Sequence, residues 1–152
     1  MNILRLFSVL AVAMPLLAQA APVSGTDSKD LCQAASQDGA LEVVVDSLMA
    51  SGRFDYGMAP QLLTLDCGGI TLIQSLINQG LAENLEFAVI DLGVDVNDPL
   101  VPVEAGALTV VQYLMQQAVL APSPEARQFA MEYMQDFRSV DFNPNLQLVT
   151  LK

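Results

Sequence analysis

The sequence contains no histidine and no tryptophan. Without histidine the commonest general base is missing, which excludes Ser-His-Asp and Cys-His arrangements in their usual forms. A zinc site is disfavoured for the same reason, because two cysteines alone do not complete a tetrahedral ligand shell. The chain also has no Gly-x-Ser-x-Gly elbow and no phosphate-binding loop that ends in Gly-Lys-Ser or Gly-Lys-Thr. We therefore expect a protein that is not an enzyme and that holds neither a metal nor a cofactor.

Basic residues are scarce. Six Lys and Arg stand against 17 Asp and Glu, which gives a formal net charge of −11. None of the six lies between Arg53 and Arg127, an interval with acidic residues from Asp55 to Glu104. A field of one sign repels nucleic acid and anionic lipid head groups, and it attracts a basic protein or divalent cations. We expect a protein partner and no nucleic acid, although an acidic surface also simply keeps an exported protein in solution.

The first 20 residues have the order of a secretory signal peptide. Arg5 precedes an apolar run from Leu6 to Leu17, and Ala18-Gln19-Ala20 follows as a small-residue cleavage site. The run of about 12 residues is shorter than the roughly 20 that a membrane-spanning helix needs. We predict cleavage before Ala21, a periplasmic or secreted protein with no membrane span afterwards, and a net charge that changes from −11 to −12 as Arg5 is lost.

Only two cysteines are present, Cys32 and Cys67, and both follow the predicted cleavage site. In an oxidising compartment one intramolecular disulfide is the default. Two free thiols or an intermolecular bridge stay open as alternatives. An intramolecular bond would close a loop of about 36 residues, which chain entropy values at roughly 3–4 kcal/mol.

Helical periodicity dominates the rest of the chain. We predict a flexible lead over residues 21–28, an all-α domain over residues 29–143 and an extended tail over residues 144–152. The tail either packs along the domain or adds to a sheet edge of another chain. The expected helices are one capped by Asp27 or Ser28 and five over about residues 40–50, 71–78, 83–92, 108–119 and 124–137.

The helices form pairs that look repeated. Three turns share their chemistry at spacings of 40 and 46 residues, and two helix starts, Thr71–Ile77 and Thr109–Met115, align with each other. We expect about three helix–turn–helix pairs, stacked as a short solenoid or as an irregular bundle. In the second case the turns share Asp and Asn only for local hydrogen bonding. The turns are Phe54-Asp55-Tyr56-Gly57, Val94-Asp95-Val96-Asn97 and Val140-Asp141-Phe142-Asn143.

These turns supply the candidate partner contacts. Tyr56 and Phe142 are aromatic residues at turn tips, where exposure would make them contact residues and burial would make them core. Asp95, Asn97 and Asp98 give the middle turn its acidity. The same turn could ligate calcium weakly, but it lacks the EF-hand spacing and its closing Glu. We therefore interpret this segment as a structural turn in preference to a calcium site.

Two carboxylate pairs could hydrolyse a glycosidic bond: Glu83 with Glu86, and Asp95 with Asp98. Neither pair sits in a distinctive motif. Both occupy a helix start or a turn, where exposed amides favour carboxylates for structural reasons. A glycan-directed enzyme is therefore the least favoured of our functional hypotheses.

The middle unit resembles an ankyrin repeat. Gly93-Val94-Asp95-Val96-Asn97 is similar to the ankyrin turn Gly-Ala-Asp-Val-Asn, and Glu83–Ile90 is similar to the second ankyrin helix. The stretch Gly69-Ile70-Thr71-Leu72-Ile73 corresponds to the Gly-x-Thr-Pro-Leu-His opening, without its Pro and His, and the spacing exceeds the usual 33 residues. The resemblance implies paired helices and, by analogy, a binding surface.

A second resemblance covers about a third of the chain. Cys32-Gln33-Ala34-Ala35 and Cys67-Gly68-Gly69-Ile70-Thr71-Leu72 are similar to the Cys-x-Ala-Ala and Cys-x-Gly-x-Ser/Thr-Leu pattern of a small secreted proteobacterial family of unknown function. This resemblance implies that the two cysteines pair, and it implies no activity.

The function that we predict is that of a non-enzymatic interaction protein of the bacterial cell envelope. It would bind a protein partner through its acidic centre or its turn tips. The alternative is an inhibitor or immunity-type protein that blocks the cationic cleft of a basic secreted enzyme.

Overall fold

The fold is all-α, as the periodicity predicts. The computed structural model describes residues 22–100 and 108–141. The predicted signal peptide, the tail over residues 144–152 and Phe142 lie outside the described residues. In chain order the helices are α1 (Gly25–Ala34), α2 (Ala40–Ala50), the 3-10 helix η1 (Tyr56–Leu63), α3 (Leu72–Gln79), α4 (Ala82–Glu86), the π-helix η2 (Phe87–Asp91), α5 (Val110–Leu120) and α6 (Pro124–Asp141).

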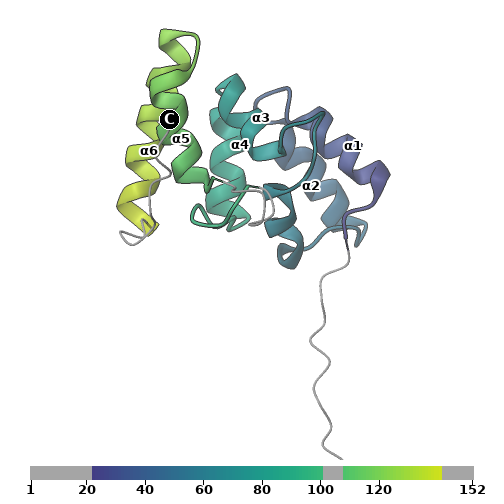
Figure 1. Ribbon diagram of the computed structural model, residues 1–152. Coiled ribbons are helices and arrows are strands. Elements are labelled where there is room, and N and C mark those ends of the chain that lie inside the picture. The colour runs from purple at the N-terminus through teal and green to yellow at the C-terminus, as the bar shows by residue number, and fades with distance from the viewer. Residues whose placement is uncertain (1–21, 101–107, 142–152) are drawn as a thin grey trace, which may run out of the picture.

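The α-helices form three neighbouring pairs, α1 with α2, α3 with α4, and α5 with α6 (Figure 1). Helix α2 contacts α4, and α3 contacts both α5 and α6. The middle pair therefore lies between the two outer pairs, and this arrangement is a helical bundle. Its equivalence to stacked ankyrin repeats stays a prediction.

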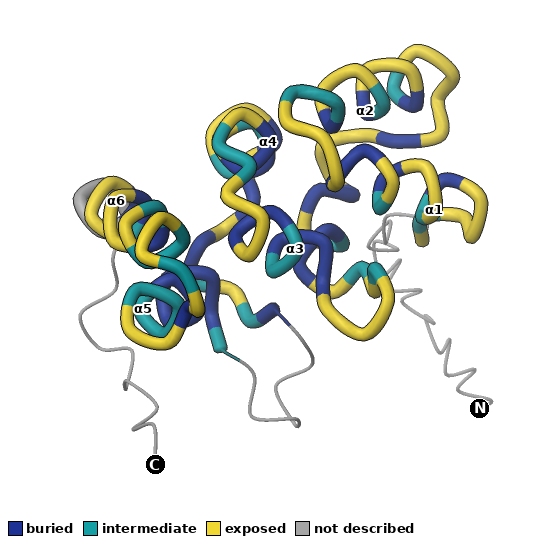
Figure 2. Tube along the Cα trace, turned by 90° about the horizontal axis from the view of Figure 1, so that it is seen from above, coloured by how far each residue is buried: buried dark blue, intermediate teal, exposed yellow. Residues whose placement is uncertain are grey.

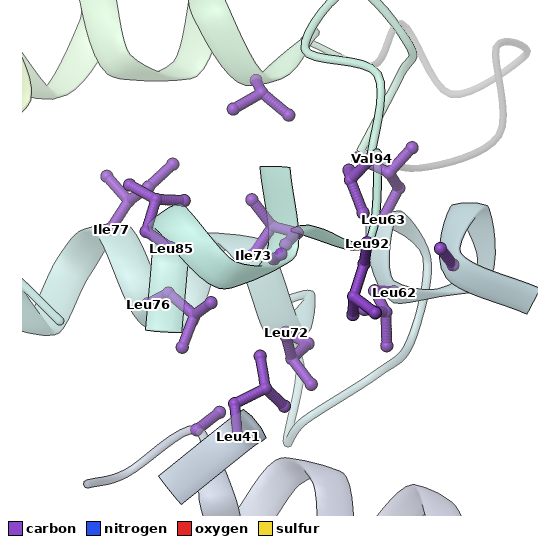
Figure 3. Packing of buried hydrophobic residues seen from close by; sticks show 14 of the residues in the cluster. Leu41, Leu62, Leu63, Leu72, Ile73, Leu76, Ile77, Leu85, Leu92 and Val94 are labelled. Carbon is purple, nitrogen blue, oxygen red and sulfur yellow. The ribbon is translucent and has the colours of Figure 1, made fainter. Parts of the chain in front are cut away.

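Helix α3 lies at the centre of the core (Figure 2). Its four apolar side chains, Leu72, Ile73, Leu76 and Ile77, are each at most 1% exposed. They point to more than one side of the helix and meet side chains of the neighbouring elements, including Leu41 and Leu85 (Figure 3). Burial of each such side chain contributes about 1.5–3 kcal/mol, so α3 anchors both neighbouring pairs.

Helices α3 and α5 begin in the same way. The Oγ1 atoms of Thr71 and Thr109 each accept the backbone N–H three residues on, at 3.2 Å. The side chains of Gln74 and Gln112 complete the capping boxes by accepting the Thr71 and Thr109 backbone N–H at 2.9 and 3.0 Å. The two segments that align in the sequence thus start their helices with identical hydrogen bonds.

Helix α1 begins at Gly25, so residues 25–28 are helical and not part of a flexible lead. The helix cap is Ser24, whose Oγ accepts the Asp27 N–H at 3.2 Å, and not Asp27 or Ser28. The Asp27 side chain is buried and forms an ion pair with Arg53 in the loop that follows α2. This contact fixes the first turn of α1, and nothing in the local sequence indicates it.

The first of the three similar turns also differs from its prediction. Tyr56 opens the 3-10 helix η1, where a turn was expected. Gly57 and Pro60 interrupt helical periodicity in this segment, because both residues disfavour a regular α-helix. Burial of Met58, Ala59, Leu62 and Leu63 holds the segment helical nonetheless.

Buried polar contacts join the pairs. Asn84 of α4 is fully buried, and its Oδ1 accepts the Leu41 N–H of α2 at 3.0 Å. Its Nδ2 donates to the Gln37 carbonyl at 2.8 Å and to the Ala34 carbonyl at 3.4 Å. On the other side, the Tyr133 hydroxyl of α6 donates to Glu86 of α4 at 2.6 Å. These bonds orient the outer pairs against the middle one.

A disulfide joins Cys32 and Cys67, with Cα atoms 5.3 Å apart and a sequence separation of 35 residues. It ties the last turn of α1 to the loop before α3, which confirms the intramolecular pairing over its alternatives. The bond is compatible with an oxidising compartment. Within the part of the chain that the structure describes, no helix is long and apolar enough to cross a membrane.

Candidate functional site

Residues 92–98, which we name the central turn, follow the π-helix η2 and present the predicted acidic contacts. Gly93 has a φ of 74°, a left-handed conformation that favours glycine and turns the chain out of the helix. The alternate side chains Val94 and Val96 are buried at 2% and 3% exposure. Burial of the valines leaves Asp95 and Asp98 exposed, and Asn97 is half-buried between them.

Hydrogen bonds fix the shape of the central turn. The Oδ1 of Asp95 accepts the backbone N–H of Asn97 at 2.8 Å and its side-chain amide at 3.1 Å. The backbone N–H of Asp98 donates to the Asp95 carbonyl at 3.1 Å. The structure therefore brings Asp95, Asn97 and Asp98 together, as their spacing predicts.

A hollow of about 300 Å³ opens beside the central turn. Its walls come from Val89 of η2 and from Gly93, Val94, Asp95 and Asn97. The hollow thus combines an apolar wall with a carboxylate and an amide. An aliphatic stem with a cationic head matches this combination, since the stem packs on valine and the head meets Asp95.

Exposed side chains extend this surface along η2. Ile90 is 69% exposed, and its neighbour Asp91 is exposed as well. The pKa of the Asp98 carboxyl is raised, first by partial burial and then by the Asp95 carboxylate. A cation bound between the two carboxylates would relieve this repulsion.

The described residues contain no group of three or more Asp, Glu or Cys side chains that could hold a metal ion. Asp95 and Asp98 alone supply two carboxylates, and Ca²⁺ takes six to eight oxygen ligands.

Tyr56 is exposed, at 67%, but it does not line the hollow at the central turn. The sequence places the two turns in equivalent positions, whereas the structure puts Tyr56 at the start of η1 on a separate segment. Tyr56 thus stays a candidate contact of its own and does not belong to the acidic site.

The carboxylate pair of Glu83 and Glu86 has structural contacts. Glu86 accepts the hydroxyl hydrogen bond of Tyr133. Glu83 lies over Gly39, where an added Cβ atom would stand 2.6 Å from its Oε2. The two side chains thus pack α4 against different neighbours, Glu86 against α6 and Glu83 against the turn before α2.

Two further hollows were not predicted from the sequence. One, of about 500 Å³, runs along α1 and α2 and is lined by polar and apolar side chains, among them Asp30, Gln33 and the exposed Val43. The other, of about 410 Å³, lies between the end of α3 and the turn that joins α5 to α6. The first is formed by residues 30–53 of neighbouring segments, and its exposed Val43 is a local signal. The second is formed by residues that lie far apart along the chain, from Ile77 to Ala126.

The fold class is thus a three-pair helical bundle with an acidic central turn. Comparison of the chain with models of known protein families, with curated proteins and with solved structures finds no match.

Proposed function

We propose that this chain is an exported, non-enzymatic interaction protein of the bacterial cell envelope, and that its central turn binds a basic protein. The observation that carries the proposal is the hollow at the central turn, where valine walls and the Asp95 carboxylate lie together, with the exposed Ile90 directly after Val89 in the sequence. Such a surface suits an inserted Lys or Arg side chain with apolar contact around it. No Lys or Arg lies between Arg53 and Arg127, so this part of the sequence supplies no basic side chain that would compete with the partner for the Asp95 carboxylate.

Export forms part of the proposal. The N-terminal charge, apolar run and small-residue site favour secretion, and the disulfide between Cys32 and Cys67 supports an oxidising destination. N-terminal sequencing of the protein recovered from outside the cytoplasm tests this step. A chain that starts at Ala21 is expected, and a chain that keeps Met1 would contradict it.

The partner is found by crosslinking and affinity capture of the oxidised protein in envelope extract, followed by mass spectrometry. The decisive variant is D95N/D98N, which removes two charges while both side chains keep a hydrogen-bonding oxygen. The matched control is E42Q/D46N, because both residues are exposed on α2 and the charge change is the same. We expect one stoichiometric basic partner that the control captures and D95N/D98N loses at least tenfold.

Salt dependence adds a second readout. Capture is expected to fall when the salt concentration rises from about 50 to about 300 mM, because the Debye length shortens from roughly 14 to 6 Å. Equal capture by the wild type and by D95N/D98N would overturn the central turn as the site. If the partner is a secreted enzyme whose turnover stops in the complex, the inhibitor or immunity-type function is the correct one.

A further inference from the structure

The hollow between α3 and the α5–α6 turn, which we name the neutral pocket, differs in chemistry from the rest of this acidic protein. Figure 1 shows the α5–α6 turn projecting beyond the ends of α3 and α4, and the pocket of about 410 Å³ lies where this turn meets the end of α3. Its volume is in the range of pockets that enclose a ligand group. None of its lining side chains carries a charge.

Several uncharged polar groups converge on the neutral pocket. The Tyr113 hydroxyl donates to Asn78 Oδ1 at 2.8 Å, which leaves the Asn78 Nδ2 as a donor and the Tyr113 oxygen as an acceptor. Tyr113 is only 8% exposed, so its ring forms a fixed wall. The side-chain amide of Gln117 makes no hydrogen bond to the described residues and offers one further acceptor and two donors.

Apolar groups complete the neutral pocket and its rim. Ile77 and Pro122 line the pocket together with alanine side chains. Leu120, which directly precedes the lining residue Ala121 at the end of α5, is 59% exposed. A pocket beside an exposed aliphatic side chain is typical of a protein contact in which one anchor residue is inserted. The lining side chains carry no charge, and the Arg127 guanidinium donates to the carbonyl of the lining residue Ala121, so a cationic anchor would be desolvated with a like charge nearby.

We propose that the neutral pocket binds an aliphatic side chain of a partner protein together with the peptide group next to it. The aliphatic group packs against Ile77 and Pro122. The peptide N–H donates to the Gln117 carbonyl oxygen or to the Tyr113 oxygen, and the peptide carbonyl accepts from Asn78 Nδ2. This site is separate from the central turn, so it stands or falls independently of the proposed function.

The test is a titration of the ¹⁵N-labelled, oxidised protein with N-acetyl-leucine-N-methylamide, followed by amide NMR spectra. This probe carries one aliphatic side chain between two peptide groups. We expect saturable shifts of the Asn78 and Gln117 side-chain amides and of the backbone around Ala121, with a dissociation constant on the order of 1 mM. The shifts are expected to be the same at about 50 and 300 mM salt, in contrast to binding at the central turn.

Matched variants localise the binding. Gln117→Ala is expected to weaken it about tenfold, the cost of a net hydrogen bond of ordinary strength. Gln116→Ala removes a glutamine side chain from the preceding position of α5, which is outside the pocket lining. This variant is expected to bind the probe like the wild type. Unchanged circular dichroism and melting temperature show that both variants are folded.

Three results would overturn the proposal. One is the absence of saturable shifts up to about 20 mM probe, roughly twenty times the expected dissociation constant. Another is equal weakening by Gln116→Ala and Gln117→Ala. The third is equal or tighter binding of N-acetyl-lysine-N-methylamide or N-acetylglucosamine at the same residues, since the pocket would then select a cation or a sugar and not an aliphatic peptide unit.

Discussion

Replacement of Asn84 by alanine tests how strongly buried polar contacts hold the helix pairs together. The Asn84 side chain is fully buried, accepts the Leu41 N–H at 3.0 Å and donates to the Gln37 carbonyl at 2.8 Å. In Asn84→Ala the N–H and the carbonyl lose these partners, and each loss costs about 1–3 kcal/mol. We expect a loss of about 4 kcal/mol in the free energy of unfolding. This is a large part of the roughly 5–15 kcal/mol that a domain possesses.

The assay is urea-induced unfolding followed by circular dichroism. At about 3–4 °C per kcal/mol for a domain of this size, the melting temperature is expected to fall by about 12–16 °C. The control is Gln128→Ala on α6, because Gln128 is exposed, and its replacement is expected to change stability by less than about 0.5 kcal/mol. A loss below about 1 kcal/mol in Asn84→Ala would refute the reasoning, since it would mean that water or a small shift satisfies both groups.

Asn84→Asp changes the hydrogen bonds of the buried side chain while its volume stays nearly the same. The ionised carboxylate keeps an acceptor for the Leu41 N–H, but it turns an oxygen toward the Gln37 and Ala34 carbonyls, which need a donor. Burial and these carbonyls raise the pKa of such a carboxyl in the folded state. We expect stability to be lowest at neutral pH and to recover as the pH falls through the raised pKa, because the protonated acid donates again. A loss that does not change with pH would contradict this account, because restoring the donor by protonation would then restore no stability.

Three further predictions concern separate features of the fold. C32S/C67S is expected to lose about 4 kcal/mol, from the chain entropy of the loop that the disulfide closes, and a thiol assay of the untreated wild type is expected to detect no free cysteine. Thr71→Ala and Thr109→Ala are each expected to cost about 1 kcal/mol in urea unfolding, because each removes a cap of the same geometry; costs that differ by more than about 1 kcal/mol would show that the caps are not equivalent. Burial, and after it the hydrogen bond to a carboxylate, raises the pKa of Tyr133. The stability that the Tyr133 hydroxyl contributes is therefore present below about pH 10 and is lost as the pH rises above that value. Between about pH 8 and pH 11, Tyr133→Phe is expected to lose less stability than the wild type does.

Most helices could be predicted because local chemistry marks their ends. Thr71 and Thr109 start α3 and α5, and Gly80 ends α3 with a φ of 68°. The helix η1 could not be predicted, because Pro60 breaks the periodicity while tertiary burial of its apolar side chains keeps the segment helical. The π-helix η2 was expected as a plain continuation of α4, since a π-helix leaves the same residue types on its buried face.

The candidate site likewise has one part that the sequence predicts and another part that depends on packing. The exposure of Asp95 follows from the sequence, because it lies between the apolar residues Val94 and Val96, whereas Asp98 is exposed outside this alternation. The hollow beside them needs Val89, whose position depends on the end of η2. The neutral pocket is still harder to predict from the local sequence. Its residues Ile77, Tyr113 and Pro122 come from three segments that only the packing of α3 against α5 and α6 brings together.

The middle pair links both proposed sites, and this has a measurable consequence. Helix α3 supplies Asn78 to the neutral pocket, while α4 and η2 lead into the central turn. Asn84 and Glu86 bind this pair to α1–α2 on one side and to α6 on the other. A ligand that binds only the folded state stabilises whatever unfolds together with its site. The probe in the neutral pocket should therefore raise the melting temperature of the entire bundle, reported by α1 and α2 as much as by α5 and α6. If the outer pairs unfolded independently, α1 and α2 would melt at an unchanged temperature, and the polar contacts of α4 would not couple the pairs.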